Sequence, residues 1–289
     1  MAAIEHVQPS GRRPGKIAIA ILGTAALVAV TVVALRHSPS PGRVVVLPQA
    51  TTTVKCGDTI TVSITVGNDL ANCPSNGLNV GANGIIINLN GHTLTGQIGG
   101  YGVYNPTFST VTIENGSVKG WSFGVYDVGP TNKVTGVRAS QNDSGMFVVG
   151  TGSTVSADVS FSNTQYGIYV GNAGITGIKV TSNVVRQNGT QGIFVNGTGT
   201  VVQTNQAENN TSNGIYDQGT GNTMTGNITN GNGSDGINSA GDATAAVGTN
   251  TANYNSAYGI EAAAGGKDSG GNLAKGNGAA AQCKDVVCS

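Results

Sequence analysis

The chain has 289 residues, of which 46 are glycine, 10% are charged and 5% are aromatic. Disordered chains combine low hydrophobicity with high net charge, whereas this sequence is 38% hydrophobic with a formal net charge of zero, which excludes an intrinsically disordered protein. Residues 1–43 hold five of the fourteen basic groups and one of the fourteen acidic groups, which leaves nine basic against thirteen acidic groups, a net charge of −4. This remainder has no basic stripe, so the composition argues against a nucleic-acid-binding domain.

The N-terminal region has the composition of a targeting sequence. Residues 1–16 are a basic segment that we expect to remain in the cytoplasm, and residues 17–35, IAIAILGTAALVAVTVVAL, contain no charge. This length lies between the core of a signal peptide and a membrane-spanning helix. Two alternatives stay open: a cleaved signal sequence, with release after Ala34, and an uncleaved membrane anchor. Residues 36–50, rich in Ser and Pro, follow as a linker. In both cases we expect an extracytoplasmic protein, secreted or anchored at the cell surface.

Four cysteines fit an oxidising compartment. Cys56 and Cys73 flank the start of the next region, and Cys283 and Cys288 lie at its end. Of the three possible connectivities, local pairing of 56 with 73 and of 283 with 288 is favoured. No histidine lies near either pair, so we expect disulfides rather than a metal site, and no cofactor.

A repeat of about 22 residues organises the rest of the chain. A glycine followed by an aliphatic residue or Met recurs at Gly77, Gly102, Gly124, Gly145, Gly167, Gly192, Gly214, Gly236 and Gly259. Short β-branched segments alternate with Gly and Asn, and helix-forming residues are scarce, which predicts short strands. The pattern predicts an all-β fold, a parallel β-helix of about nine rungs over residues 51–282, followed by a disulfide-stapled tail at 283–289.

Asparagine marks the bends of this repeat in two rows. One row holds Asn183, Asn205, Asn227, Asn250 and Asn272, with Val137 and Asp158 in the earlier places. The other row, five residues later, holds Asn142, Asn163, Asn188, Asn210, Asn232, Asn255 and Asn277. Asn tolerates left-handed backbone angles, and its amide can donate and accept hydrogen bonds. We therefore expect two structural ladders of asparagine amides along the axis.

The first rungs resemble a known group of proteins. The segment CGDTITVSITVGNDLANCPSNGLNVGANGIIINLNGHTLTG, residues 56–96, is similar to the opening of secreted bacterial right-handed parallel β-helix proteins of the pectin-lyase-like superfamily. The resemblance is carried by Cys56-Gly57-Asp58, by Gly77-Leu78 with Gly81-Ala82, and by Leu89-Asn90-Gly91-His92-Thr93. It implies a right-handed solenoid. It does not imply one activity, because the superfamily includes lyases, hydrolases, epimerases and adhesins.

No group of residues in the repeat forms a recognisable catalytic site. His92 is the one histidine beyond the linker, and the resemblance implies that it belongs to a structural turn. Asp127 and Asp217 occupy equivalent places four rungs apart, about 19 Å at ~4.8 Å per strand, too far for a glycosidase pair. The candidate bases of a lyase are Arg138, Lys179 and Arg186, but Arg186 shares its phase with Glu208 on the next rung, which predicts a surface salt bridge. The catalytic residues therefore stay unknown, and no acidic cluster suggests a metal.

An aromatic row is the strongest candidate for a ligand-binding surface. The residue two after the marker glycine is Tyr104, Tyr126, Phe147, Tyr169, Phe194 and Tyr216 in six successive rungs. Strand alternation places the preceding residues, such as Ile168 and Ile193, inside, so the rings should face outward along a row about 24 Å long. Two interpretations remain open: stacked rings that stabilise neighbouring rungs, or a platform for sugar rings or a partner.

Three functions are compatible with this sequence. The first is an exported protein, expected to be a monomer, that binds polysaccharide or another cell-surface ligand along its side sheets. The second is a carbohydrate-active enzyme, a polysaccharide lyase or epimerase, with an unrecognised site. The third is a structural spacer at the cell surface. The missing histidines and paired acids favour the first and third. Membrane contact would come only from the N-terminal segment, if it is not cleaved.

Overall fold

The computed structural model describes residues 18–20, 29–31 and 50–289, and it divides into two units, Met1–Gln49 and Ala50–Ser289. In the first unit, β1 (Ala18–Ala20) and β2 (Ala29–Thr31) pair as antiparallel strands. Most of the predicted signal or anchor segment and nearly all of the linker lie outside the described residues. Within the described residues, no helix is long and apolar enough to span a membrane.

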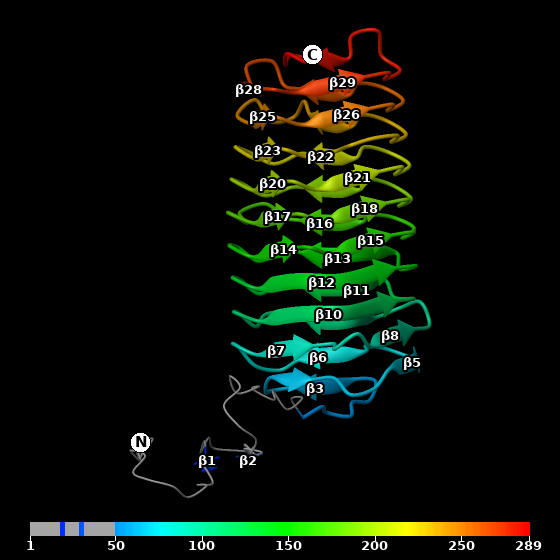
Figure 1. Cartoon of the computed structure of the whole chain (residues 1–289), viewed down its shortest axis with the longest axis vertical. Helices are drawn as coiled ribbons and strands as arrows, with labels where there is room; N and C mark the ends of the chain where they lie inside the picture. Colours follow the sequence, from blue (N-terminus) through cyan, green and yellow to red (C-terminus); the bar gives the residue numbers. More distant parts are fainter. Residues whose placement is uncertain (1–17, 21–28, 32–49) are drawn as a thin grey trace, which may run out of the picture. The chain divides into compact units, whose positions relative to one another are not determined.

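The second unit is a stack of parallel strands, one coil above another (Figure 1). An 11-stranded sheet contains one strand from each successive coil. Its strands are β3 (Asp58–Ile60), β6 (Leu78–Val80), β9 (Tyr101–Asn105), β11 (Phe123–Asp127), β13 (Ser144–Val148), β16 (Ile168–Val170), β19 (Ile193–Val195), β22 (Ile215–Asp217), β24 (Ile237–Ser239), β27 (Ile260–Ala262) and β30 (Cys283–Lys284). The all-β parallel solenoid predicted from the repeat is confirmed, with somewhat more coils than the nine expected.

A 15-stranded sheet forms the other walls of the solenoid. Its strands are β4 (Ile64–Thr65), β5 (Leu70–Cys73), β7 (Ile86–Asn88), β8 (Thr93–Gly96), β10 (Thr112–Lys119), β12 (Lys133–Ser140), β14 (Thr154–Ser156), β15 (Val159–Phe161), β17 (Lys179–Thr181), β18 (Val184–Arg186), β20 (Val201–Gln203), β21 (Gln206–Glu208), β23 (Thr223–Thr225), β25 (Ala246–Gly248) and β28 (Lys267–Gly270). The pair β26 (Thr251–Asn253) and β29 (Leu273–Lys275) continues one of these walls toward the C-terminus. The sheet has two limbs. In most coils one strand precedes the first asparagine row and a second strand follows it, whereas β10 and β12 run through both limbs.

The core is a set of apolar columns that run along the axis. Val103, Val125, Met146, Ile168, Ile193 and Ile215 are all completely buried. The predicted orientation of these strands, with the isoleucines inside and the aromatic residues outside, is confirmed. Trp121, the largest fully buried side chain, donates from Nε1 to the carbonyl of Leu94 at 3.2 Å.

The marker glycines are required by the close approach of neighbouring coils. A Cβ atom added to Gly192 would lie 2.6 Å from the carbonyl oxygen of Gly214, and one added to Gly214 would lie 2.7 Å from that of Gly236. Neither residue has a positive φ. Glycine therefore recurs here because any side chain would push two coils apart, and not because the backbone is left-handed.

The asparagines form two hydrogen-bonded rows inside the bends. Successive amides are joined by Nδ2–Oδ1 hydrogen bonds of 2.9 to 3.2 Å. Asn205 is typical: its Oδ1 accepts from the backbone N–H and the amide of Asn183, and its Nδ2 donates to Asn227 and to the carbonyl of Val180. The ladder residues are 0% to 8% exposed. Each amide therefore pairs buried backbone groups of neighbouring coils as well as its own neighbours in the row.

One part of the sequence prediction was wrong: the ladder asparagines are not the left-handed residues of the bends. The residue before each of them takes the positive φ, for example Ser182 at 59° before Asn183 and Gln187 at 57° before Asn188. The left-handed residue turns the chain with its side chain directed away from the core. The next residue then points inward, where its amide meets the coils above and below.

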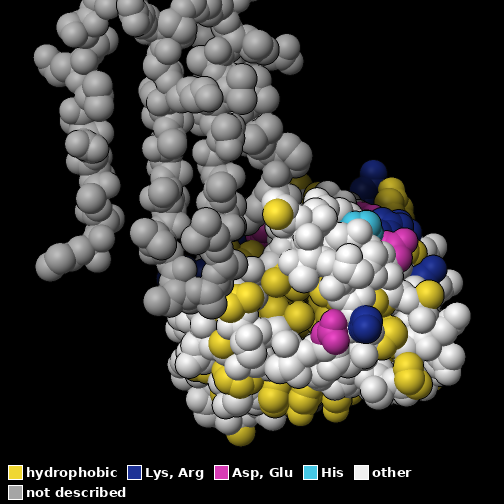
Figure 2. Space-filling model, turned by 90° about the horizontal axis from the view of Figure 1, so that it is seen from below, with side chains coloured by type: hydrophobic (Ala, Val, Ile, Leu, Met, Phe, Trp, Pro, Cys, Tyr) yellow, Lys and Arg dark blue, Asp and Glu magenta, His cyan; other side chains and the backbone are white. Residues whose placement is uncertain are grey.

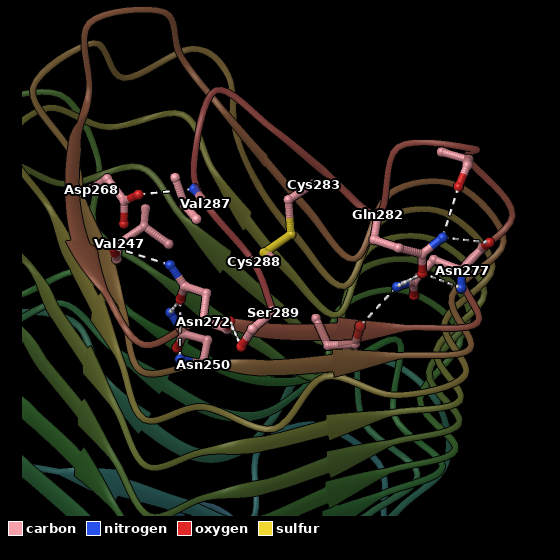
Figure 3. Close-up of a disulfide and its surroundings, with 12 residues drawn as sticks. Val247, Asn250, Asp268, Asn272, Asn277, Gln282, Cys283, Val287, Cys288 and Ser289 are labelled. Atoms are coloured by element: carbon pink, nitrogen blue, oxygen red, sulfur yellow. Dashed lines mark hydrogen bonds between the residues drawn. A yellow bond between two sulfur atoms is a disulfide. The ribbon is translucent and has the colours of Figure 1, made fainter.

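The two disulfides join the predicted partners, Cys56 with Cys73 and Cys283 with Cys288. At the C-terminal end, the segment predicted as a tail continues the fold (Figure 3). Gln282 takes the place of the next ladder amide, because its Oε1 accepts from the backbone N–H of Asn277 at 2.8 Å and from its Nδ2 at 2.9 Å. Ser289 donates its backbone N–H to Asn272. The last residues therefore form a partial coil that covers the end of both rows.

Asp158 occupies a ladder position with a carboxyl group instead of an amide. Its Oδ1 accepts from the N–H of Val137 at 2.7 Å, and its backbone N–H donates to Asn183. Its Oδ2 is buried and has no hydrogen-bond partner among residues 50–289. Burial raises the pKa of Asp158 to about 8, since the charged form loses its hydration.

We expect Asn227→Ala to lower the free energy of unfolding by about 1–3 kcal/mol, because it leaves the buried N–H of Asn205 and the carbonyl of Val202 without a partner. Asn210→Ala and Asn250→Ala should behave alike. The measurement is chemical denaturation, with Asn253→Ala as the control: Asn253 is partly exposed, and within residues 50–289 its side-chain amide makes no hydrogen bond. Equal midpoints for all four variants and the parent would contradict the ladder's role.

We expect Asp158→Asn to flatten the pH dependence of stability. The folded-state pKa of about 8 lies above the ordinary value near 4, so the folded state holds a proton that the unfolded state releases. The contribution of Asp158 to the parent's stability should therefore be highest below pH ~4 and fall as pH rises to about 8. Over this pH range the free energy of unfolding of Asp158→Asn should rise relative to that of the parent. Thermal unfolding at several pH values tests this, with Asp143→Asn, at a partly exposed position, as the control. Parallel pH profiles for the parent and Asp158→Asn would refute it.

Candidate functional site

The six predicted aromatic residues lie side by side on the outer face of the 11-stranded sheet. The strand register pairs Tyr104 with Tyr126, and then Phe147, Tyr169, Phe194 and Tyr216 in successive coils. Five of these side chains are partly exposed, and Phe194 is 8% exposed. The outward row is thus a continuous surface feature of β9, β11, β13, β16, β19 and β22.

The rings of this row pack against one another along the axis. Phe147 stacks on Tyr126 with ring centroids 5.1 Å apart and on Tyr169 at 4.8 Å, and Tyr169 stacks on Phe194 at 4.7 Å. Phe194 and Tyr216 meet edge to face at 5.7 Å. Part of each central ring face is therefore covered by its neighbours, so solvent meets ring edges and hydroxyl groups as well as ring faces.

Three further rings belong to the same surface and were missed in the sequence. Tyr101, Phe123 and Tyr166 each stand directly before a marker glycine, and their rings contact the row, Tyr101 and Tyr104 being 4.6 Å apart. We call the nine residues together the aromatic face: Tyr101, Tyr104, Phe123, Tyr126, Phe147, Tyr166, Tyr169, Phe194 and Tyr216. The position before the glycine was the available signal, but Ser, Gln, Asn, Asp and one further Tyr fill it in other coils.

One hydroxyl group of the aromatic face has a shifted pKa. Burial, followed by the neighbouring Tyr101 and Tyr104, raises the pKa of Tyr126 above its ordinary value. Its hydroxyl can therefore both donate and accept a hydrogen bond. Toward the C-terminus the row becomes polar, since Asn238 donates to Glu261 at 3.0 Å and Lys284 pairs with Glu261 at 2.7 Å.

The structure separates the candidate acid–base residues from the aromatic face. Asp127 and Asp217 lie inside the solenoid with 0% exposure, where Asn132 and Asn222 donate to them at 2.6 and 2.7 Å. Burial raises the pKa of Asp127 to about 7 and that of Asp217 to about 6. These two carboxyl groups face the core, so they cannot reach a ligand on the outer surface.

His92 has a structural partner. Its Nδ1 lies 2.9 Å from Oδ1 of Asp69, and the same oxygen accepts the backbone N–H of Thr93 at 2.9 Å. The hydrogen bond from Thr93, followed by that from His92, lowers the pKa of Asp69. The carboxylate thus ties the turn at His92 to the preceding coil. Charged side chains of both signs are sparse in the view from the β3 end (Figure 2).

The predicted salt bridge between Arg186 and Glu208 is wrong. The two residues are register neighbours, but Arg186 donates to the side chain of Gln187 at 3.0 Å, and Glu208 accepts from Asn230 at 3.3 Å. The guanidinium Cζ of Arg186 lies 5.1 Å from the ring centroid of Phe161. An exposed ion pair contributes only about 0–1 kcal/mol, so contact with a partly buried ring competes with it.

Arg138 joins Arg186 at the same ring. Arg138 and Phe161 line a basic groove on the 15-stranded sheet, and Arg186 adjoins the groove through its contact with Phe161. The groove has a volume of about 270 Å³ and is lined by Thr93, Ser117, Lys119, Arg138, Ser140, Gln141 and Phe161. Lys179, the third basic candidate, lies on β17 in the other limb of the sheet. Within the described residues, no three His, Cys, Asp or Glu side chains gather where they could hold a metal ion.

Solved structures of similar shape are parallel β-helix proteins at low sequence identity. The A-module of mannuronan C-5 epimerase AlgE6 from Azotobacter vinelandii is 16% identical with a TM-score of 0.61, the match covering 81% of this chain and 80% of that one. Pectate lyase Pel9A is 15% identical with a TM-score of 0.52, covering 82% and 71%. The Dettilon tailspike protein is 18% identical with a TM-score of 0.50, covering 76% and 53%. These similarities show the fold.

No curated protein matches the chain in sequence. A family model described as "Right handed beta helix region" matches residues 61–220, more than half of the chain. The match agrees with the stacked coils and parallel sheets of the structure, and the chain therefore belongs to the right-handed beta helix family.

Proposed function

We propose that this protein is an extracytoplasmic, non-catalytic carbohydrate-binding solenoid whose aromatic face binds polysaccharide. The observation that carries the proposal is the aromatic face itself: nine contiguous rings, six of them tyrosines, on the outer side of one sheet. Tyrosine supplies an apolar ring and a hydrogen-bonding hydroxyl at one position, which suits a ligand that has apolar C–H faces and hydroxyl groups.

The rigidity of the face supports binding of an extended ligand. Each ring is held by the strand register and by contacts with neighbouring rings, so few side-chain rotamers have to be fixed when a ligand binds. The row also repeats at the strand spacing, about 4.8 Å per coil, so equivalent contacts recur along a polymer. Because neighbouring rings cover part of each face, hydroxyl and edge contacts should contribute more than face-on stacking.

Two further observations agree with this proposal. Both disulfides join their predicted partners, as expected of a protein from an oxidising compartment outside the cytoplasm. Two structurally similar proteins are named for carbohydrate polymers, mannuronan and pectate. The buried position of Asp127 and Asp217 and the pairing of His92 with Asp69 favour binding over catalysis, since these groups are engaged in the fold.

Removing hydroxyl groups while keeping the rings tests the proposal. We expect the triple variant Tyr104→Phe, Tyr126→Phe and Tyr169→Phe to keep the stacking and the melting temperature. Each lost hydrogen bond is worth about 0.5–1.5 kcal/mol, so affinity should fall roughly tenfold or more. The measurement is retention of the full chain on immobilised mannuronan, polygalacturonate and a neutral β-glucan, with absorbance recorded for unsaturated products.

The matched control is Tyr254→Phe, because Tyr254 is 66% exposed and lies outside the aromatic face. Retention of the parent and the control, with weaker retention of the triple variant, supports the proposal. If the parent binds none of the polymers, or if the triple variant binds as the parent does, the aromatic face is not a binding surface. Formation of unsaturated product by the parent would replace binding with lyase activity.

A further inference from the structure

The basic groove carries an inference that is independent of the aromatic face. Its lining comes from neighbouring strands of one limb of the 15-stranded sheet, β8, β10, β12 and β15. The register aligns Lys119 with Ser140, Ser140 with Phe161, and Phe161 with Arg186, whereas Ser117 and Arg138 form the adjacent column. One surface therefore holds three cationic side chains over three strand steps, about 14 Å.

These positive charges have no carboxylate partner. Residues 50–289 contain two ion pairs, His92 with Asp69 and Lys284 with Glu261, and neither involves the groove. Glu208, beside Arg186 on the next strand, accepts a hydrogen bond from Asn230 instead. In a region with four more acidic than basic groups, three clustered and unpaired cations form a distinct positive surface.

Phe161 contacts both guanidinium groups. Arg138 places its Cζ 4.3 Å from the ring centroid and Arg186 places its Cζ at 5.1 Å. Contact with the ring restrains two long side chains that would otherwise lose conformational freedom on binding a ligand. The arginines are thus partly preorganised for an anion.

The chemistry of the lining defines the ligand. Guanidinium groups match carboxylates through paired N–H donors, and Lys119 adds a further charge. Ser117, Ser140, Thr93 and Gln141 supply neutral donors and acceptors that suit hydroxyl groups beside the anion. We propose that this groove is a second ligand site, on a different sheet from the aromatic face, which binds a carboxylate-bearing saccharide.

Other polyanions fit the surface less well. A nucleic acid requires a longer basic track, because its affinity depends on many phosphate contacts, and this limb offers Lys119, Arg138 and Arg186. A small inorganic anion would use the arginines but not the hydroxyl groups and the amide spread along the groove. A saccharide that bears a carboxylate should therefore bind more tightly than a small inorganic anion.

Titration calorimetry of the full chain with oligogalacturonate tests the site. We expect binding that weakens as salt concentration rises, much weaker binding of the methyl-esterified oligosaccharide, and much weaker binding of sodium sulfate. Arg138→Gln with Arg186→Gln should reduce affinity for oligogalacturonate at least about tenfold. The melting temperature should stay close to that of the parent, because Arg138 is exposed and Arg186 partly exposed.

The control is Lys179→Gln, which removes one charge from the other limb of the same sheet. Its affinity should equal that of the parent, and the triple tyrosine variant of the aromatic face should keep the parent's preference for the acid over the ester. Equal binding of acid and ester, or unchanged binding by the double arginine variant, overturns the proposal. Sulfate binding as tight as that of the oligosaccharide also overturns it, in favour of a simple anion site. Failure here would leave binding by the aromatic face unaffected.

Discussion

Every feature of this solenoid depends on one constraint: the backbone groups in each bend are buried between coils and must be paired. Strand hydrogen bonds pair the backbone groups along the sheets, whereas at the bends the ladder amides supply hydrogen bonds to the backbone. Asn205 joins Asn183 in the coil before it to Asn227 in the coil after it, and it also accepts the backbone N–H of Asn183. An aliphatic residue at this place would leave buried polar groups unpaired. Asparagine therefore recurs every 21 to 25 residues for a reason internal to the fold.

This constraint fixes the outer surface as well as the core. Coils that are held in register by amides and by marker glycines place equivalent residues in columns, so a residue type repeated in the sequence becomes a row in space. The aromatic face is such a row, with Phe147 and Tyr169 stacked at 4.8 Å. The groove is another: Lys119, Phe161 and Arg186 share a column because β10, β12, β15 and β18 are aligned. Ligand-binding surfaces in this fold therefore arise from repetition, without long loops.

The repeat predicted the fold and the direction of the aromatic row and of the residues before it, because these follow from period and alternation. The disulfide partners were predicted separately, from the positions of the cysteines at the two ends of the repeat region. The repeat could not predict the local conformation within a coil. The left-handed residue lies one place before each ladder asparagine, at Ser182 and Gln187 among others, and many residue types fill that place. The sequence also showed that Arg186 and Glu208 would be neighbours, but not which rotamers they adopt. Their side chains turned to Phe161 and Asn230 instead.

The second set of rings was missed for a related reason. Tyr101, Phe123 and Tyr166 occupy a place in the coil that is filled by Ser, Gln, Asn, Asp or Tyr in other coils, so no continuous period marks them. They matter because each contacts the predicted row from the side, as Tyr166 does at 5.4 Å from both Tyr169 and Phe194. These three rings therefore widen the aromatic row, although the position before the marker glycine shows no regular pattern in the sequence.

The buried carboxyl groups show how the interior of the solenoid limits where function can lie. Asp127, Asp158 and Asp217 each have one oxygen paired with N–H donors and a second oxygen without a partner among residues 50–289. Burial raises the pKa of all three, so each carboxyl group gains a proton at a higher pH than an exposed one does. Such groups serve the stacking of coils, and a polymer outside the solenoid cannot reach them. Recognition of a ligand therefore depends on side chains that the packing of the coils leaves free, and two such sets within residues 50–289 are the rings of one sheet and the cations of the other.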